Sequence, residues 1–206
     1  MKILILGATG SIGTHLVEQS LMLGHSVRAL VRDPAKLQFK HYALEPMQGD
    51  ALVAEDVEKA TESQDAVIYA LGAGQCPHFF SQTTSLLLCA MQKHQVRRLI
   101  AITGIGTGDS RGHGGWIYER VILSLFTKSI YEDKDVQENL IRESDLDWTI
   151  VRPASFNNGP LGGRLRATDQ LEGVTISGIS RADAAAFVLH QLKSAEWLKK
   201  SPSVGY

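Results

Sequence analysis

The clearest chemical signal in the chain is a glycine-rich segment, GATGSIG, at residues 7–13. It follows four consecutive apolar residues and precedes residues with helical spacing. Glycine permits a sharp turn and a close approach of backbone to a ligand, and free N–H groups at a helix N-terminus bind phosphate. The segment therefore predicts a pyrophosphate site for a dinucleotide, and a plain turn whose glycines serve helix packing is the alternative. The candidate contacts are Gly7, Thr9, Gly10, Ser11, Ile12 and Gly13.

A second nucleotide signal follows the next apolar run, where Arg32 stands about 20 residues beyond the glycine segment. An arginine there accommodates the 2′-phosphate of NADP, whereas an acidic residue would bind the 2′-hydroxyl of NAD. Asp33 followed by Pro34 is typical of a helix N-cap, and Lys36 could add a second positive charge. The pattern favours NADP(H) over NAD(H). The alternative is that Arg32 and Lys36 form an ordinary solvated face.

Two further segments carry candidate cofactor contacts at the ends of predicted strands. The carboxylate of Asp50, next to Ala51, could accept a hydrogen bond from the adenine amino group or could cap a helix that begins at Ala54. The sequence leaves both roles open. Leu71 and Gly72 lie in a stretch of small residues that would let a cofactor lie against backbone, although strand and helix packing also explains them.

These segments need a scaffold that brings them to one edge. Short apolar runs recur along the chain, and they are too continuous to alternate faces, so both faces of each strand must be covered. Segments with helical spacing separate them, which predicts an α/β fold with a Rossmann-type doubly wound parallel sheet whose ligands bind at the carboxyl ends of the strands. The runs are 3–6, 27–31, 66–71, 99–102 and 148–151, with a weaker strand at 42–47 that contains Pro46.

Two glycine-rich stretches interrupt this alternation, at residues 104–115 and 157–163. Both follow predicted strands at their carboxyl ends. The first could be a lid with Trp116 and Tyr118 as aromatic platforms at its end, or it could simply be a flexible loop.

The C-terminal part begins after Pro153. Ser180 and Asp183 are spaced as a capping box, which predicts a final helix that starts near Ser180. The last ten residues are expected to add an edge strand or to fray. We expect one domain over residues 1–206, in which a small C-terminal extension, residues 154–206, contributes most of the substrate side.

The composition excludes several classes of protein. The 206 residues are 44% apolar and 21% charged, with a net charge of −1, which argues against nucleic acid or an anionic membrane as the main partner. No apolar run reaches about 20 residues, and glycine breaks the N-terminal run after Leu6, unlike a signal peptide. Cys76 and Cys89 lack CxxC spacing and the histidines lack metal-ligand spacing, so we expect a reduced, cytoplasmic protein without a metal.

Four motifs together resemble the atypical short-chain dehydrogenase/reductases, and more narrowly their NmrA-like NAD(P)H-binding group, which includes biliverdin and flavin reductases. The motifs are GATGSIG, VRD at 31–33, GD at 49–50 and DWTIVRP at 147–153. The resemblance covers roughly residues 1–165. It implies a Rossmann fold, a dinucleotide in an open cleft, and a small or planar substrate stacked on the nicotinamide. It also implies that Arg32 and Lys36 hold the 2′-phosphate and that Asp50 and Ala51 contact the adenine. By the same resemblance, the ribose and nicotinamide are lined by Leu71, Gly72 and Thr103, and the nicotinamide pocket is walled by Pro153 to Phe156.

The acid–base residues of the family are only partly present. The chain has no YxxxK motif, but Tyr131 and Lys134 are three residues apart and could share a helix face. The alternative is an exposed Tyr and Lys near a helix start. Thr103 precedes Gly104 at the place of the usual serine, and Ser155 stands where the biliverdin reductases have a histidine. The candidate catalytic residues are therefore Thr103, Ser155, Tyr131 and Lys134.

The missing tyrosine favours one reaction over another. Hydride transfer to a flavin needs stacking and orientation, because the proton can come from solvent, whereas carbonyl reduction needs an acid or an oxyanion donor. We therefore predict an NADPH-dependent reductase of a flavin or similar small aromatic acceptor. The alternative is a non-catalytic NADP(H)-binding redox sensor that acts through a protein partner. A sugar-nucleotide epimerase would need a larger substrate domain than residues 154–206 provide.

Overall fold

The computed structural model describes residues 1–72, 76–110, 125–172, 174 and 176–206. An eight-stranded sheet forms its centre, with strand order β3-β2-β1-β4-β5-β6-β10-β8. Every pair from β3 to β10 is parallel, and only β8 is antiparallel to its neighbour. The strands are β1 (Lys2–Leu6), β2 (Ser26–Val31), β3 (Leu44–Gln48), β4 (Ala66–Tyr69), β5 (Arg98–Ile102), β6 (Asp147–Pro153), β8 (Arg166–Thr168) and β10 (Ser203–Gly205).

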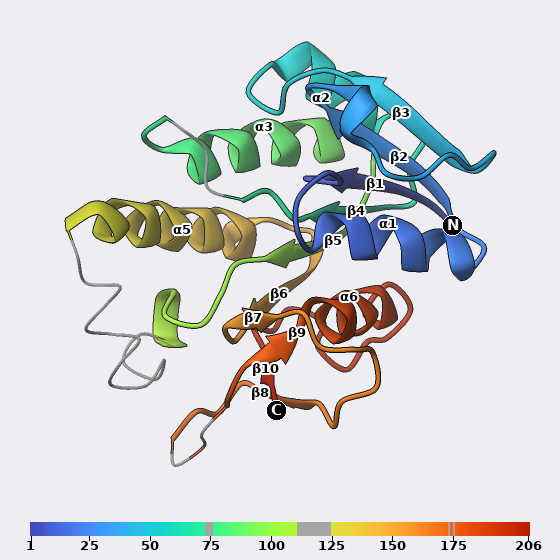
Figure 1. The fold of residues 1–206 in the computed structure, drawn as a ribbon. Helices are drawn as coiled ribbons and strands as arrows, with labels where there is room; N and C mark the ends of the chain where they lie inside the picture. The colour runs from blue at the N-terminus through green and yellow to red at the C-terminus, as the bar shows by residue number, and fades with distance from the viewer. Residues whose placement is uncertain (73–75, 111–124, 173, 175) are drawn as a thin grey trace.

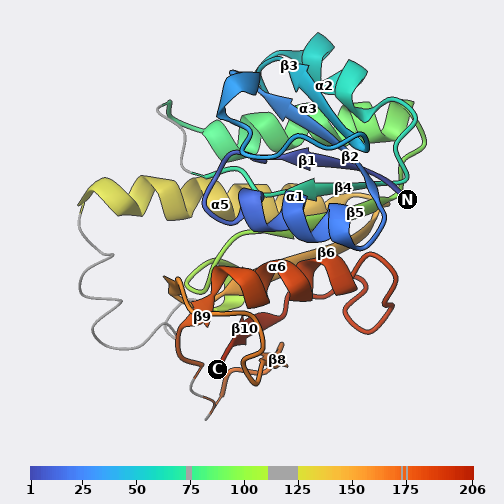
Figure 2. The ribbon, with the colours of Figure 1, turned by 45° about the vertical axis from the view of Figure 1, so that its right-hand side comes forward.

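Helices cover both faces of the sheet, as the continuous apolar strands require. Figures 1 and 2 show α1 and α6 side by side on one face and α2, α3 and α5 on the other. The bounds are α1 (Gly13–Met22), α2 (Ala54–Thr61), α3 (Phe79–Lys93), α5 (Leu125–Glu143) and α6 (Arg181–His190), with short 3-10 turns η1 (Pro34–Lys36) and η2 (Gly108–Ser110). The predicted doubly wound Rossmann-type fold is confirmed.

Two hydrophobic clusters fill the spaces between these layers. One joins the sheet to α1 and α6 through residues such as Leu16 and Val188. The other joins it to the opposite helices through Val57, Leu87 and Ile141. All of these side chains are fully buried, so the helices are held firmly against the strands whose ends carry the candidate site.

The edges of the sheet differ from the sequence expectation in one respect. The weak strand with Pro46 is present as β3, and it is an edge strand, where proline is tolerated. The last residues form β10, which lies between β6 and β8 and is therefore neither an edge strand nor frayed. Its Val204 is fully buried, because β8 pairs antiparallel to it and covers that side.

A second, two-stranded parallel sheet extends the carboxyl end of β6. It pairs β7 (Phe156–Asn157) with β9 (Ile179–Ser180), immediately before α6. The predicted helix start is confirmed, since Ser180 is the N-cap of α6 and its Oγ accepts a hydrogen bond of 3.0 Å from the Asp183 N–H. The reciprocal bond of a capping box is replaced, because the Ser180 N–H donates to the Tyr206 hydroxyl. The Asp183 carboxylate in turn accepts bonds from the N–H groups of Gly162 and Gly163 and from the Tyr206 hydroxyl.

Candidate dinucleotide site and active site

The glycine segment forms a tight turn between β1 and α1. Gly7 has φ +88°, and the Gly10 N–H donates to its carbonyl over 2.9 Å. A Cβ on Gly7 would strike the carbonyl of Ala70, and one on Gly13 would strike the carbonyl of Gly7. Both positions therefore require glycine for steric reasons.

The N-terminus of α1 is open to an anion. Among the described residues, no side chain caps it and no acidic residue lies in its first turn. Thr9, Gly10 and Ser11 are exposed, whereas the Ile12 side chain is buried in the core, which leaves only its backbone for a ligand. An uncapped helix start beside a glycine turn fits a pyrophosphate.

A cavity of about 520 Å³ opens at this turn and brings together most of the predicted cofactor contacts. It is lined from the carboxyl ends of β1, β2, β3 and β4, the edge where ligands bind in doubly wound sheets. The predicted residues that line it are Gly7, Thr9, Gly10, Arg32, Asp50, Ala51, Leu71 and Gly72.

The cavity is also lined by residues that the sequence patterns did not predict as cofactor contacts. Phe79, the first residue of α3, lines it together with Leu52 and Cys76. The half-buried Phe79 ring meets the Phe80 ring edge-on at 5.6 Å. The available signal in the sequence was the aromatic pair Phe79-Phe80, which comes five residues after Gly74, because such a ring can pack on a flat base.

The residues after β2 divide between structure and binding. Asp33 caps η1 by accepting from the Ala35 N–H at 3.0 Å, with Pro34 as the first residue of the turn. Arg32 is exposed and lines the cavity. Lys36 is exposed on η1 and is not among the lining residues. Arg32 is therefore the cation placed at the cavity.

Asp50 does not cap α2, but its carboxylate shapes the turn that precedes this helix. Its Oδ1 accepts from the Leu52 N–H at 2.9 Å, which shapes the turn before α2, although the N-cap residue of α2 is Val53. The Asp50 N–H donates to the Asp56 carboxylate over 2.9 Å. The same residue lines the cavity, half-buried, beside Ala51.

A second group of candidates meets at the carboxyl end of β5. The Lys134 ammonium on α5 donates a hydrogen bond of 2.8 Å to the Thr103 carbonyl and lies 5.0 Å from the centre of the Phe80 ring. Burial lowers the pKa of Lys134 to about 8, while the Glu138 carboxylate acts in the opposite direction. Tyr131 is half-buried one turn earlier on α5. Lys134 is thus not an exposed lysine near a helix start.

The Thr103 hydroxyl is engaged in a buried ionic network. It donates to Glu138 Oε1 at 2.8 Å, and the Thr107 hydroxyl donates to the same oxygen at 2.6 Å. Arg152 from β6 binds both oxygens of Glu138, at 3.1 and 2.6 Å, and also pairs with Asp109. Burial alone would raise the pKa of Glu138, but Arg152 and the two hydroxyls hold it below its usual value.

The sequence patterns did not predict this network. The signal was Arg152 inside the otherwise apolar strand TIVRP, because a charge in a strand buried on both faces must find a partner. The network ties the loop after β5 to α5 and β6, and Arg142 extends it by pairing with Asp109 and Glu138.

The two remaining candidates lie at the end of β6. Pro153 is buried, and its carbonyl accepts from the Ile105 N–H at 3.2 Å. Ser155 is exposed, and its carbonyl accepts from the Ile179 N–H at 3.0 Å, which starts the small second sheet. Residues 111–124, with Trp116 and Tyr118 of the predicted lid, lie outside the described residues.

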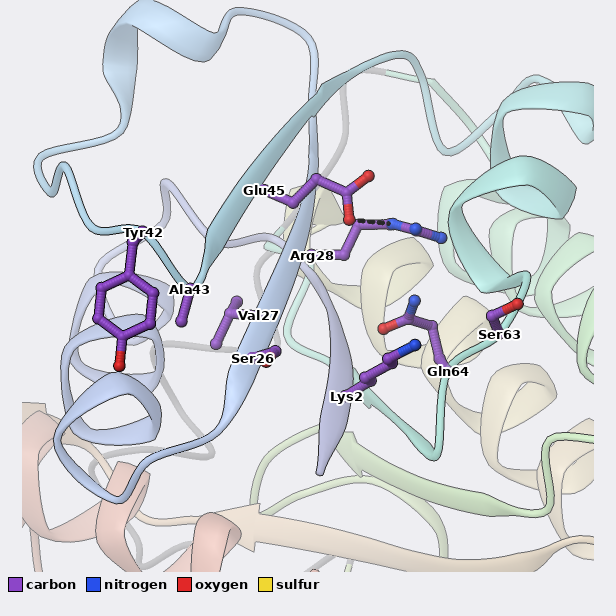
Figure 3. A pocket seen from close by; sticks show the side chains of 9 residues that line it. All are labelled: Lys2, Ser26, Val27, Arg28, Tyr42, Ala43, Glu45, Ser63 and Gln64. Carbon is purple, nitrogen blue, oxygen red and sulfur yellow. Dashed lines mark hydrogen bonds and ion pairs between the residues drawn. The ribbon is translucent and has the colours of Figure 1, made fainter.

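A smaller pocket of about 210 Å³ lies at the opposite, amino edge of the sheet (Figure 3). Arg28 crosses it to pair with Glu45 and to donate to the carbonyls of Lys59, Ala60 and Glu62 at the end of α2. Arg28 therefore caps the C-terminus of α2 by binding its last carbonyl groups, which is a structural role.

Among the described residues, His, Cys, Asp and Glu side chains do not gather in groups of three that could hold a metal ion. Along the same residues, no helix is long and apolar enough to cross a membrane.

The fold, the uncapped glycine turn and the adjoining cavity define a dinucleotide-binding protein. A family model described as NAD(P)H-binding matches residues 7–195, so the chain belongs to that family, and the resemblance drawn from the motifs is confirmed. The uncharacterized protein YwnB of Bacillus subtilis (strain 168) is 28% identical over 210 residues, which is 95% of this chain and 94% of its own.

Solved structures share the same fold. ChuY, an anaerobillin reductase from Escherichia coli O157:H7, has a TM-score of 0.83 at 22% identity and covers 100% of this chain and 97% of its own. A short-chain dehydrogenase/reductase from Veillonella parvula DSM 2008, solved in complex with NADP, has a TM-score of 0.83 at 18% identity, over 100% of this chain and 94% of its own.

Proposed function

We propose that the protein is an NADPH-dependent reductase of a flavin or a similar small aromatic acceptor. The observation that carries this proposal is the cavity at the glycine turn, lined by Arg32 and with the Lys134 site on the same carboxyl edge of the sheet. Bound NADPH would supply a hydride. The chain's own residues would hold the dinucleotide, orient the acceptor and exclude water from the site.

The preference for NADPH over NADH rests on the residues that follow β2. A protein that prefers NADH binds the ribose 2′-hydroxyl with a free carboxylate at this position. Here the Asp33 carboxylate is used to cap η1. Arg32 is exposed at the cavity, where its guanidinium can bind a phosphate by two N–H groups. The complex of the Veillonella neighbour with NADP is in keeping with this choice.

Proton supply would fall to Lys134 rather than to Thr103. The hydroxyl hydrogen of Thr103 is donated to Glu138, so this residue would fix the loop after β5. The Lys134 ammonium, with a pKa near 8, would still hold its proton at neutral pH and could release it to an acceptor. A flavin would need this proton less than a carbonyl would, since solvent can protonate the reduced flavin.

The C-terminal extension, residues 154–206, would form most of the substrate side. It contributes the two-stranded sheet β7–β9, which continues directly from the end of β6. Its limited size suits a small acceptor. One observation favours the alternative, a redox sensor that binds NADP(H) and signals through a protein partner: the hydroxyl of Thr103, the residue whose carbonyl binds Lys134, is already engaged with Glu138.

The test is a fluorescence titration of the protein with NADPH and with NADH, followed by addition of flavin mononucleotide while nicotinamide absorbance is recorded. We expect tight NADPH binding and steady oxidation. Tight binding with oxidation at background would contradict the reductase and favour the sensor.

The cofactor preference has its own variant. Arg32→Ala should weaken NADPH binding by about 10- to 100-fold, which is the value of one or two charged hydrogen bonds, and should leave NADH binding within about twofold. Lys199→Ala is the matched control, because it removes a positive charge from an exposed residue beside the start of β6, at the amino edge of the sheet. Equal binding of both cofactors before and after Arg32→Ala would refute the 2′-phosphate assignment.

A further inference from the structure

Arg181, the first residue of α6, is stacked on an aromatic ring at the substrate side. Its guanidinium lies 5.4 Å from the centre of the Phe156 ring, which belongs to β7. One terminal nitrogen donates a hydrogen bond of 2.7 Å to Oδ1 of Asn158. Both partners are neutral, so they orient the guanidinium without balancing its charge.

The charge of Arg181 has no acidic partner among the described residues. The carboxylate nearest to it on α6, Asp183, is fully used by the N–H groups of Gly162 and Gly163 and by two hydroxyls. The Nε atom of Arg181 is buried and lacks a hydrogen-bond acceptor. An unpaired donor on a buried part of a charged group costs more free energy than a neutral one.

The position of this arginine relates it to the candidate active site. Phe156 follows the end of β6 closely, and the pairing of β7 with β9 places it beside the start of α6. Phe156 packs against the hydrophobic cluster that lies between the sheet and helices α1 and α6. Arg181 therefore lies beyond the carboxyl end of β6, the strand end whose Pro153 carbonyl binds the loop after Thr103.

We propose that Arg181, held by Phe156 and Asn158, binds an oxyanion carried by the acceptor, either a phosphate or a carboxylate. This inference rests on the proposed function and narrows its substrate to an aromatic acceptor with an anionic group. A guanidinium presents a planar fork of N–H donors that matches both oxyanions, and the aromatic ring beneath holds that plane in place. The bound oxyanion supplies the counter-charge that the protein's own carboxylates do not.

The experiment compares two flavins that differ by one phosphate, flavin mononucleotide and riboflavin. Their dissociation constants are measured on the NADP⁺ complex by quenching of flavin fluorescence, where no hydride is available and turnover cannot contribute. The wild type should bind flavin mononucleotide at least about tenfold more tightly than riboflavin. Arg181→Gln should bring the two within about twofold and leave riboflavin and NADPH binding unchanged.

Two further variants make the result specific. Arg181→Lys keeps the charge but loses the fork, so it should retain part of the preference. Arg97→Gln removes the same charge from an exposed arginine that pairs with Asp147 at the amino edge of the sheet, and it should keep the full preference. Inorganic phosphate should compete with flavin mononucleotide and not with riboflavin. This competition distinguishes the oxyanion from the rest of the flavin.

Several outcomes would overturn the inference. Equal weakening of both flavins by Arg181→Gln would show that the arginine only supports the fold. Weakened NADPH binding would assign it to the cofactor. Failure of both flavins to bind the wild type would also reject it. Failure of the reductase is seen separately, as bound flavin and bound NADPH without oxidation of the nicotinamide.

Discussion

The Lys134 ammonium on α5 donates a hydrogen bond of 2.8 Å to the carbonyl oxygen of Thr103, and so lies at the residue that follows β5. The two residues are 31 positions apart in the chain. This contact, together with the Glu138 network beside it, fixes an ammonium whose pKa is lowered by burial at the carboxyl edge of the sheet.

Lys134→Met removes the ammonium and keeps most of the apolar stem. With a carbonyl acceptor, kcat should fall by about 100-fold or more, because the general acid is lost. With a flavin, kcat should fall by less than about tenfold, since solvent supplies the proton. Steady-state kinetics with both acceptors measure the difference. Equal losses would assign Lys134 to cofactor binding or to folding.

The same lysine sets a pH dependence. Its pKa is lowered to about 8, so the protonated acid is present below that pH and is lost as the pH rises through it. The kcat for a carbonyl acceptor should therefore decline on the alkaline side near pH 8, and Lys134→Met should lack this limb. A limb that persists in the variant would come from another group.

Glu138→Gln should destabilise the protein, because it leaves the buried Arg152 without one of its two carboxylates. Breaking a buried ion pair costs about 3–5 kcal/mol. Urea unfolding at neutral pH measures this change, and Glu143→Gln, at the exposed last residue of α5, is the control. A loss within about 1 kcal/mol would mean that Asp109 alone satisfies the arginine.

The stability difference should also depend on pH. The pKa of Glu138 is lowered in the folded protein from its ordinary value of 4.5, so its contribution is complete above that value and disappears as the pH falls through the lowered pKa. The gap between wild type and Glu138→Gln should narrow below about pH 4.5. A gap that stays constant in acid would show that packing, and not charge, causes it.

Gly13→Ala should damage both the fold and the site, because the new methyl group meets the backbone of Gly7 and Ala8. Overpacking of this kind costs about 1–3 kcal/mol. Gly72→Ala is the informative companion, since a Cβ there meets none of the described atoms within 4 Å. It should keep the melting temperature and still weaken NADPH by narrowing the cavity that Gly72 lines. Thermal melts and NADPH titration separate the two effects.

Local sequence patterns predicted the parallel sheet, its covering helices and the glycine turn. The apolar runs, the helical spacing and the N-cap at Ser180 depend on neighbours in the chain, so they can be predicted from the sequence. The pairings of Arg152 with Glu138 and of Arg181 with Phe156 depend on which elements become neighbours in space. The interior position of β10 also depends on which elements become neighbours, because the sequence of this short strand does not indicate its partners.

The order of the strands has a consequence for how the chain folds. β8 joins the large sheet only through β10, which is made later in the chain, after α6. Strands β1 to β6 and the helices between them follow one another in the chain and can assemble while synthesis continues, because their contacts are closer in sequence. The C-terminal extension, residues 154–206, cannot complete its part of the sheet until β10 has been made. A newly made chain should therefore acquire the ability to retain a nucleotide before it acquires any acceptor specificity.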